Sequence, residues 1–321
     1  MVEKLLSVED LKTYFLTRRG VAKAVDGVSL CLGEGESLGL VGESGCGKSV
    51  TCLSILRLVP QPAGRIVGGR ILLEGEDLLQ KSEREMRKVR GRKVAMIPQD
   101  AMTSLDPVFS IGSQLSDPIK IHQKLRGREL WNKAIELLRL VRIPSPEERL
   151  RNFPHQLSGG MRQRTAGAIA LSCQPRLLIA DESTTSLDVT IQAQFLDMLR
   201  NVQQQFKVGL IFVTHDFGIV ESMCDRVAVM YAGKVVEEAT VRGLFDTPLH
   251  PYTAALMRSV PKVDEKVERL AGIGGQPPPL YDLPPGCSFL PRCPTGNTEC
   301  QSSPPRVMVG DEHWVSCWRY A

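Results

Sequence analysis

The sequence predicts an α/β fold with a mixed β-sheet at its core, and three observations support this prediction. Residues 37–41 form a short, mostly apolar run typical of a buried strand, and 48–58 carry apolar residues at helical spacing. A glycine-rich turn of the form Gly-x-x-x-x-Gly-Lys-Ser joins this strand to this helix. Apolar runs at 94–97, 176–180 and 209–214 are each followed by polar residues, as in sheets that bind ligands beyond their strand ends.

The N-terminal part predicts an antiparallel β subdomain. Strand-like runs occur at 5–8 and 22–32, with turn signals at 26–27 and 33–35. Another strand is expected over 68–75, between glycines.

A mostly helical insert is expected over about 103–172. Apolar residues at helical spacing run from Leu130 to Val141, and two prolines close that segment. The next helix begins after Ser158, a suitable N-cap residue. Gly167 in its interior costs ~1 kcal/mol relative to Ala, so tight packing is expected there.

The remaining elements complete the sheet. A helix is expected over 191–205, and the last two strands over 226–230 and 233–237. From about residue 261 the composition shifts to proline-rich, linker-like sequence, and a cysteine-bearing tail follows.

Composition and charge narrow the function classes. The 321 residues have room for one large domain and a small one, and the 40 basic and 36 acidic residues give a net charge of +4, too balanced to favour nucleic acid as a partner. The N-terminus lacks the apolar core of a signal peptide, and no apolar run approaches the ~20 residues that span a bilayer. We therefore expect a cytosolic chain whose nine cysteines are not paired as disulfides, and whose membrane role comes through partners.

The glycine-rich turn matches a phosphate-binding loop (P-loop) with no mismatch. Its glycines let backbone N–H groups surround phosphates, and the following helix adds the partial positive charge of its N-terminus. Lys48 is expected to reach the β and γ phosphates, and the Ser49 hydroxyl to hold Mg²⁺. The same dipole is expected to lower the pKa of the Cys46 thiol. The expected nucleotide-binding residues are Gly42, Glu43, Ser44, Gly45, Cys46, Gly47, Lys48 and Ser49.

Polar residues at the ends of other predicted strands complete a candidate active site. Asp181 is placed to hold Mg²⁺, and Glu182 to accept a proton from an attacking water or to orient it. His215 could hold the γ-phosphate and bridge it to Glu182. Gln99 ends another strand. Each of these residues alone is a weak signal. A single histidine at a strand end, for example, is more often structural than catalytic.

The order of these motifs resembles the ATP-binding subunits of ABC transporters over residues 11–240. The P-loop is followed by Gln99, by the signature Leu157-Ser-Gly-Gly-Met-Arg-Gln163, by Asp181-Glu182 and by His215. The resemblance implies a P-loop NTPase fold of the ABC ATPase type that hydrolyses ATP. It also implies that two subunits pair head to tail, so that each signature caps the ATP on the other's P-loop. The signature residues expected to contact the partner's ATP are Ser158, Gly159, Gly160 and Gln163.

The same resemblance assigns further roles. Phe15 is expected to stack on adenine, with its neighbour Tyr14 ranked second. Gln99 is expected to sense Mg²⁺ and the membrane partner, and residues 186–188 to form the contact between subunits. The chain departs from the family pattern at Pro98, Ala101 and Ser183, none of which removes a chemical group.

The C-terminal region narrows the resemblance. His250 to Leu256 and Pro285 to Cys293 resemble the extension of importers for oligopeptides, dipeptides and sometimes nickel. We therefore expect a nucleotide-binding domain over 1–255 and a small extension over 256–321.

Four cysteines of this extension form a candidate metal site. From their spacing alone an iron–sulfur cluster, zinc and free thiols all stay open, although the intervals fit zinc poorly. The resemblance favours a [4Fe–4S] cluster, because some members of the importer family carry one at matching cysteines. A structural role is expected, since the tail has too few apolar residues for its own core. The four residues are Cys287, Cys293, Cys300 and Cys317.

The resemblance implies an ATP-hydrolysing motor for import of di- or oligopeptides, peripheral to the cytoplasmic face of the membrane. Its partners would be a second, non-identical ATPase subunit, two integral membrane permeases and an extracytoplasmic solute-binding protein. Import of nickel or another small solute by the same machinery is the alternative.

Other nucleotide-binding proteins fit less well. ABC ATPases of DNA repair place a long coiled coil between P-loop and signature, and those of translation carry two ATPase units in one chain. A small GTPase needs Asn-Lys-x-Asp, and the Asn-Lys pair at 132–133 is followed by Ala-Ile.

Overall fold

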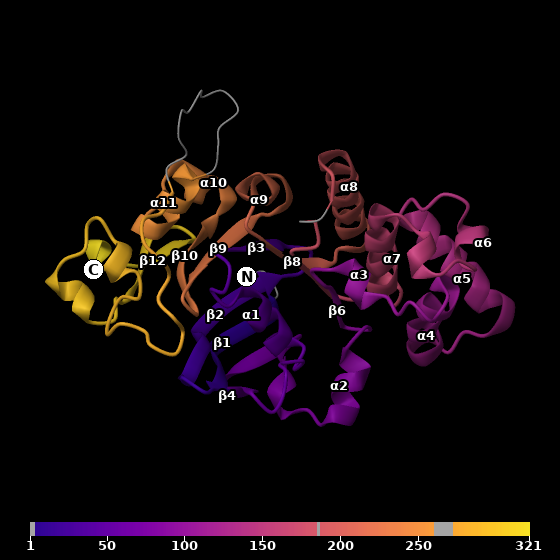
Figure 1. The fold of residues 1–321 in the computed structure, drawn as a ribbon, viewed down its shortest axis with the longest axis horizontal. Coiled ribbons are helices and arrows are strands. Elements are labelled where there is room, and N and C mark those ends of the chain that lie inside the picture. The colour runs from indigo at the N-terminus through magenta and orange to yellow at the C-terminus, as the bar shows by residue number, and fades with distance from the viewer. Residues whose placement is uncertain (1–3, 185–186, 260–271) are drawn as a thin grey trace. The chain divides into compact units, whose positions relative to one another are not determined.

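The computed structural model describes residues 4–184, 187–259 and 272–321, and the chain divides into two compact units (Figure 1). Unit 1 consists of Met1–Leu5, Gly33–Glu36 and Gln80–Phe212. Unit 2 consists of Leu6–Leu32, Ser37–Leu79 and Val213–Ala321.

Unit 2 contains the antiparallel β subdomain that the sequence predicts. Its four-stranded sheet has the order β2-β1-β4-β5. Leu6 on β1 lies opposite Leu73 on β4, and Phe15 lies opposite Gly64. The strands are β1 (Lys4–Thr17), β2 (Gly20–Gly33), β4 (Gly64–Leu73) and β5 (Glu76–Asp77), followed by the 3₁₀ turn η1 (Leu78–Gln80).

The larger sheet of unit 2 is mixed. Its strand order is β11-β12-β10-β9-β3, with β3 parallel to β9 and the other pairs antiparallel. Helix α1 follows β3, and α9 to α11 flank the later strands (Figure 1). The elements are β3 (Ser37–Val41), α1 (Lys48–Ile55), α9 (Phe217–Met223), β9 (Arg226–Tyr231), β10 (Lys234–Thr240), α10 (Val241–Asp246), α11 (Pro251–Arg258), β11 (Arg306–Gly310) and β12 (His313–Ser316), with 3₁₀ turns η3 (Leu290–Arg292), η4 (Thr298–Gln301) and η5 (Trp318–Tyr320).

Two expectations for unit 2 are wrong. Strand β10 is not the last strand, because β12 pairs with it, Glu237 lying opposite Val315, and β11 pairs with β12. Helix α1 ends at Ile55 rather than near residue 58, because Arg57 has a φ of 53°, in the left-handed region that stops a helix.

The C-terminal tail shares the core of unit 2. Phe289 is 1% exposed and packs in a buried cluster with Tyr231, Tyr252 and Val229. Its ring lies 5.2 Å from the Tyr231 ring and 5.4 Å from the Tyr252 ring, between ring centroids. The tail is therefore ordered by apolar residues that precede it in the chain.

Unit 1 contains a parallel strand pair and the helical insert. Strands β6 and β7 run parallel, with Ile97 opposite Ala180. Helices α4, α5 and α7 pack on one another in the purple and magenta part of Figure 1. The elements are α2 (Glu83–Val89), β6 (Val94–Ile97), α3 (Ala101–Ser104), α4 (Ile111–Gln123), α5 (Gly127–Leu140), α6 (Pro146–Arg149), η2 (Pro154–Gln156), α7 (Gly159–Leu171), β7 (Leu177–Asp181), α8 (Val189–Phe206) and β8 (Gly209–Thr214), which continues into unit 2.

Gly167 on α7 is not forced by tight packing, contrary to expectation. A Cβ atom built there would lie 3.6 Å from the Phe195 ring and 3.7 Å from the Met198 methyl, which are ordinary contact distances. An alanine side chain therefore fits this part of the insert.

Candidate active site

The P-loop follows β3, whose five residues are all buried. Gly42 has a φ of 151°, and a Cβ atom there would lie 2.3 Å from the carbonyl oxygen of Met230. Gly47 has a φ of 112°, and its Cβ would lie 2.2 Å from the carbonyl oxygen of Ala24. No side chain fits at either position, so the loop can fold this closely only with glycine.

Lys48 is the first residue of α1 and is 4% exposed. Its ammonium group donates to the Gly42 carbonyl at 2.7 Å and to the Glu43 carbonyl at 3.2 Å. These bonds curl the loop around the lysine head. Ser49, Ser44 and Gly45 are partly or fully exposed along the same loop, where a phosphate group could reach them.

The expectation for Cys46 is wrong. Its side chain is 5% exposed, and burial raises the pKa of the thiol, more than Lys48 lowers it. The main cause is the loss of hydration on burial, which disfavours the charged thiolate.

In unit 1 the structure brings together two predicted site residues, Gln99 of the nucleotide and Mg²⁺ site and the catalytic Glu182. Gln99, exposed just after β6, donates from its Nε2 to Oε2 of Glu182 at 2.7 Å. Asp181 ends β7 and is 4% exposed, whereas Glu182 is half-buried. Glu182 has a φ of 42°, so its backbone is strained in a region that side chains other than glycine rarely adopt.

The signature residues begin helix α7. The Ser158 hydroxyl caps the helix by accepting from the backbone N–H of Met161 at 3.3 Å, which confirms the expected N-cap. Ser158 and Gly159 are exposed and Gly160 is half-buried. Gln163 is 2% exposed on the inner side of the helix. Of the four predicted contact residues, Ser158, Gly159 and Gly160 are therefore accessible to a ligand, and Gln163 is not.

The other predicted residues lie as follows. His215 is exposed between β8 and α9, where Asp216 caps α9 by accepting from the N–H of Gly218 at 2.8 Å.

Phe15 is half-buried on β1. The Tyr14 hydroxyl donates to Asp26 at 2.6 Å, and burial with this bond raises its pKa to about 12. Asp188 is exposed at the start of α8, and Ser186 lies outside the described residues.

All four C-terminal cysteines line one cavity in unit 2, together with His250 and Trp318. The four are Cys287, Cys293, Cys300 and Cys317, and each is a free thiol. Burial raises the pKa of Cys287 and of Cys317. Over residues 4–184, 187–259 and 272–321, no three His, Cys, Asp or Glu side chains are arranged to hold a single metal ion.

Comparisons with known proteins fit this geometry. The ABC transporter family profile matches residues 25–185, and the profile of the oligopeptide/dipeptide transporter C-terminal region matches 236–300. The chain belongs to the ABC transporter family. It is an ATP-hydrolysing subunit of that family, with the ABC ATPase fold that the sequence predicts.

Curated relatives of this ABC ATPase align over nearly its whole length. The "Probable peptide ABC transporter ATP-binding protein" of Sinorhizobium fredii is 50% identical, covering 98% of this chain and 95% of that protein. The dipeptide transport ATP-binding protein DppD of Bacillus subtilis is 47% identical over 99% and 95%. The oligopeptide transport ATP-binding protein AppD of the same organism is 47% identical over 98% and 97%.

Solved structures support the fold of the ABC ATPase. The dimeric bacterial ABC transporter cassette MJ0796 matches with a TM-score of 0.66 and 24% identity, covering 74% of this chain and 99% of that one. The cbiO1 protein of Clostridium perfringens matches with a TM-score of 0.65 and 26% identity, covering 76% and 91%. No helix in the described part of the ABC ATPase is long and apolar enough to cross a membrane.

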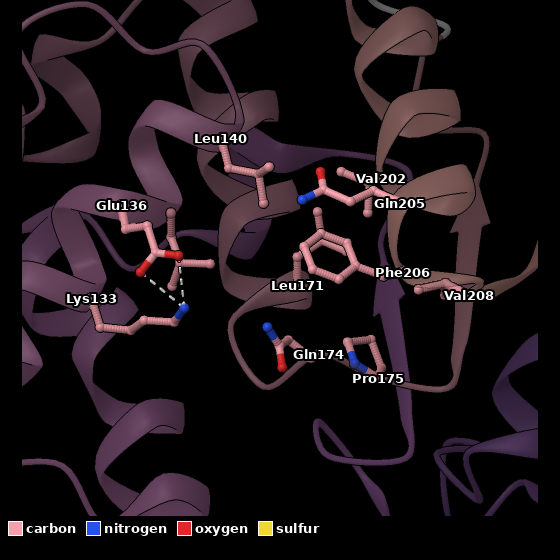
Figure 2. A pocket seen from close by; sticks show the side chains of 11 residues that line it. Lys133, Glu136, Leu140, Leu171, Gln174, Pro175, Val202, Gln205, Phe206 and Val208 are labelled. Carbon is pink, nitrogen blue, oxygen red and sulfur yellow. Dashed lines mark hydrogen bonds and ion pairs between the residues drawn. The ribbon is translucent and has the colours of Figure 1, made fainter.

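A separate cavity of about 250 Å³ lies in unit 1 between α5, the end of α7 and α8 (Figure 2). Its lining is mostly apolar, with the ring of Phe206 and the side chains of Leu140 and Leu171 turned toward it, and a Lys133–Glu136 ion pair at its edge. None of the predicted site residues of the ABC ATPase lines this cavity.

Sequence reasoning missed two residues that touch the P-loop. The Tyr252 hydroxyl accepts from the backbone N–H of Glu43 at 2.8 Å, and Arg292 forms an ion pair with the Glu43 carboxylate at 2.7 Å. Both residues follow the P-loop by more than two hundred positions, and no motif of an ABC ATPase linked them to it in advance.

Proposed function

We propose that this chain powers the uptake of di- or oligopeptides through a membrane importer. The observation that carries the proposal is the match of the oligopeptide/dipeptide transporter C-terminal region to residues 236–300, behind an ATPase body. The names of the three relatives above also refer to peptide, dipeptide or oligopeptide transport.

In the proposed ATP site, the P-loop binds the triphosphate. Its backbone N–H groups and Lys48 surround the β and γ phosphates, and the Ser49 hydroxyl, Asp181 and Gln99 hold Mg²⁺. The adenine stacks on Phe15. Support comes from the two glycines that leave no room for a side chain, and from the buried lysine at the start of α1.

For hydrolysis, Glu182 accepts a proton from the attacking water, and His215 holds the γ-phosphate. The bond from Gln99 positions one oxygen of the Glu182 carboxylate just after the end of β7. The strained backbone at Glu182 is consistent with a functional position, since such strain clusters at active sites.

We also propose that the site is completed by a second subunit. Ser158, Gly159 and Gly160 would contact the γ-phosphate bound to the partner's P-loop, using the exposed N-terminus of α7. Gln163 would join them only if its buried side chain turned outward. The partners would be a similar but non-identical ATPase, two permeases and an extracytoplasmic binding protein, with this chain peripheral on the cytoplasmic face.

The proposed domains are 1–255 for the nucleotide-binding domain, with its insert at 103–172, and 256–321 for the extension.

The chemistry of the extension fits a [4Fe–4S] cluster, because four free thiols line one cavity. When bound, such a cluster would supply a structural cross-link between chain segments. Cys287, Cys293, Cys300 and Cys317 would hold it as thiolates, which its positive iron ions would stabilise despite the burial of Cys287 and Cys317.

Peptide uptake by living cells tests the transport proposal. A strain that lacks this chain should fail to accumulate a radiolabelled dipeptide or short oligopeptide, and the wild-type chain should restore uptake. Glu182→Gln should not restore it, whereas Glu221→Gln, an exposed glutamate on α9, should. Nickel uptake is measured in the same strains, and loss of nickel uptake with normal peptide uptake would overturn the peptide assignment.

The cluster is tested on protein purified without oxygen. Iron and acid-labile sulfide should co-purify in equal amounts with a broad visible absorption band, and Cys293→Ser should lose both. Cys173→Ser, which changes a half-buried cysteine in unit 1, is the matched control. Zinc in place of iron, or metal-free wild-type protein, would contradict the assignment.

A further inference from the structure

Glu43 of the P-loop is bound on its side chain by a residue of the C-terminal extension. Arg292 donates from Nη1 to Oε2 at 2.7 Å and from Nη2 to Oε1 at 3.0 Å, a two-point contact between guanidinium and carboxylate. The side chain of Arg292 is 3% exposed and that of Glu43 is 27% exposed. The pair is therefore shielded from water on the arginine side.

The backbone of Glu43 is bound by a second residue. Its N–H donates to the hydroxyl of Tyr252 at 2.8 Å, and Tyr252 is fully buried near the start of α11. The Tyr252 ring lies 4.6 Å from the Tyr231 ring, measured between centroids. Side chain and main chain of one P-loop residue are thus both fixed from outside the loop.

The guanidinium of Arg292 has a fixed orientation because each of its five N–H donors has an acceptor. Nε donates to the Gly274 carbonyl at 2.9 Å, and the remaining donors reach the Tyr231 hydroxyl and the Ile273 carbonyl besides Glu43. The Cζ atom of Arg292 also lies 5.8 Å from the centroid of the Tyr231 ring and 5.9 Å from that of the Phe289 ring. A rotation of this arginine away from Glu43 would break several contacts at once.

We propose that Arg292 and Tyr252 are positioning residues for nucleotide binding. A carboxylate in a phosphate-binding loop repels the triphosphate, and the fixed charge of Arg292 both neutralises Glu43 and turns it away from the loop's interior. Tyr252 sets the backbone of the same residue. Through Arg292, the C-terminal extension thereby influences the ATP affinity of the P-loop.

This inference rests on the proposed role of the P-loop, and the two can be tested apart. Lys48→Ala probes the P-loop role itself: if that variant still binds ATP normally, the proposed site is wrong. Arg292 variants probe only the coupling between the extension and the loop.

The decisive measurement is the KM and kcat for ATP of the purified transporter assembled with its partner chains. Arg292→Met leaves Glu43 uncompensated and should raise KM about tenfold, the effect of about 1.4 kcal/mol, with a smaller change in kcat. Replacing Glu43 as well, in Glu43→Gln/Arg292→Met, removes the repelling charge and should return KM to within about threefold of wild type. A merely structural loss in the extension would not be rescued by a change in the P-loop.

Arg306→Met is the matched control. It makes the same substitution in the same extension, where the guanidinium stacks on the Trp314 ring at 3.6 Å. Its KM should stay at the wild-type value. An equal rise of KM in Arg306→Met, an unchanged KM in Arg292→Met, or a double variant that stays as weak as the single one would each overturn the proposal.

Tyr252→Phe keeps the ring and removes only the hydroxyl, so it can be measured even if Arg292→Met does not fold. Loss of one acceptor for a backbone N–H should raise KM about threefold. A wild-type KM in Tyr252→Phe would overturn the part of the proposal that concerns the backbone of Glu43.

Discussion

Strand β3 in unit 2 and strand β7 in unit 1 are each followed by a residue with positive φ, but different residue types occupy the two turns. Gly42 follows β3 with a φ of 151°, and a Cβ there would collide with the Met230 carbonyl. Glu182 follows β7 with a φ of 42° and keeps a full side chain, whose carboxylate accepts from Gln99.

The difference reflects what each turn must present. The P-loop offers its backbone N–H groups, and any side chain at its tightest points, Gly42 and Gly47, would collide with the backbone of a neighbouring strand. The turn after β7 must offer a carboxylate, so the chain accepts a backbone strain of about 1–2 kcal/mol there. One turn is specified by its backbone and the other by its side chain.

The largest effect on activity is expected at the turn after β7, which presents the Glu182 carboxylate. Glu182→Gln keeps the shape and the bond partner of Glu182 but removes the base, so kcat should fall by about a hundredfold or more while ATP still binds. The variant should accumulate as an ATP-bound dimer, measured by ATPase assay and size-exclusion chromatography. Glu221→Gln should leave kcat unchanged. Unimpaired turnover in Glu182→Gln would contradict the assigned role.

Substitutions at the P-loop glycines should instead reduce stability and ATP affinity. Gly47→Ala places a methyl group 2.2 Å from the Ala24 carbonyl, so the free energy of unfolding should fall by about 3 kcal/mol and ATP affinity at least about tenfold. Gly45→Ala is the matched control: its φ of 78° costs only about 1 kcal/mol, and nothing lies within 4 Å of the new methyl. Urea unfolding and calorimetric ATP titration measure both. Equal effects of the two variants would show that close packing does not specify the loop.

Much of this comparison was predictable from the sequence. The bounds of β6 and β8 agree with the apolar runs 94–97 and 209–214, because buried strands between turns leave a continuous apolar signal. The P-loop was predictable because its glycines and lysine are required by the geometry itself. The strain at Glu182 was not, since no local pattern demands a positive φ there.

The C-terminal strands escaped prediction for a physical reason. Residues of β11 are mostly exposed and carry no alternating apolar pattern, so the strand forms only because β12 pairs with it. Strand β10 contains two carboxylates, Glu237 and Glu238, that are almost fully buried. They are stabilised by His313 and Trp314 on β12 and by Arg226 on β9, partners that sequence spacing does not reveal.

The P-loop turn also contains a thiol, Cys46, whose reactivity should be lowered by burial. Cys46 in the P-loop is buried with a raised pKa, so less of it is thiolate at neutral pH than in an ordinary cysteine. Maleimide should label Cys46 more slowly than the half-buried Cys31, and its labelling should speed up as the pH rises. Peptide mapping by mass spectrometry measures both rates. Faster labelling of Cys46 at pH 7 would show that the helix dipole prevails over burial.

The smallest effect is expected for two glycines of helix α7, one with room for a methyl group and one without. Gly167 on α7 has ordinary helical backbone and room for a methyl group, so Gly167→Ala should raise the free energy of unfolding by about 0.5–1 kcal/mol. Gly160 on the same helix is the control, because its Cβ would lie 2.7 Å from a methyl group of Ile191 and Gly160→Ala should not stabilise. Urea midpoints measure the difference. A destabilised Gly167→Ala would mean that α7 and α8 pack more closely than these distances allow, and that glycine is needed inside the helix as well as in the P-loop.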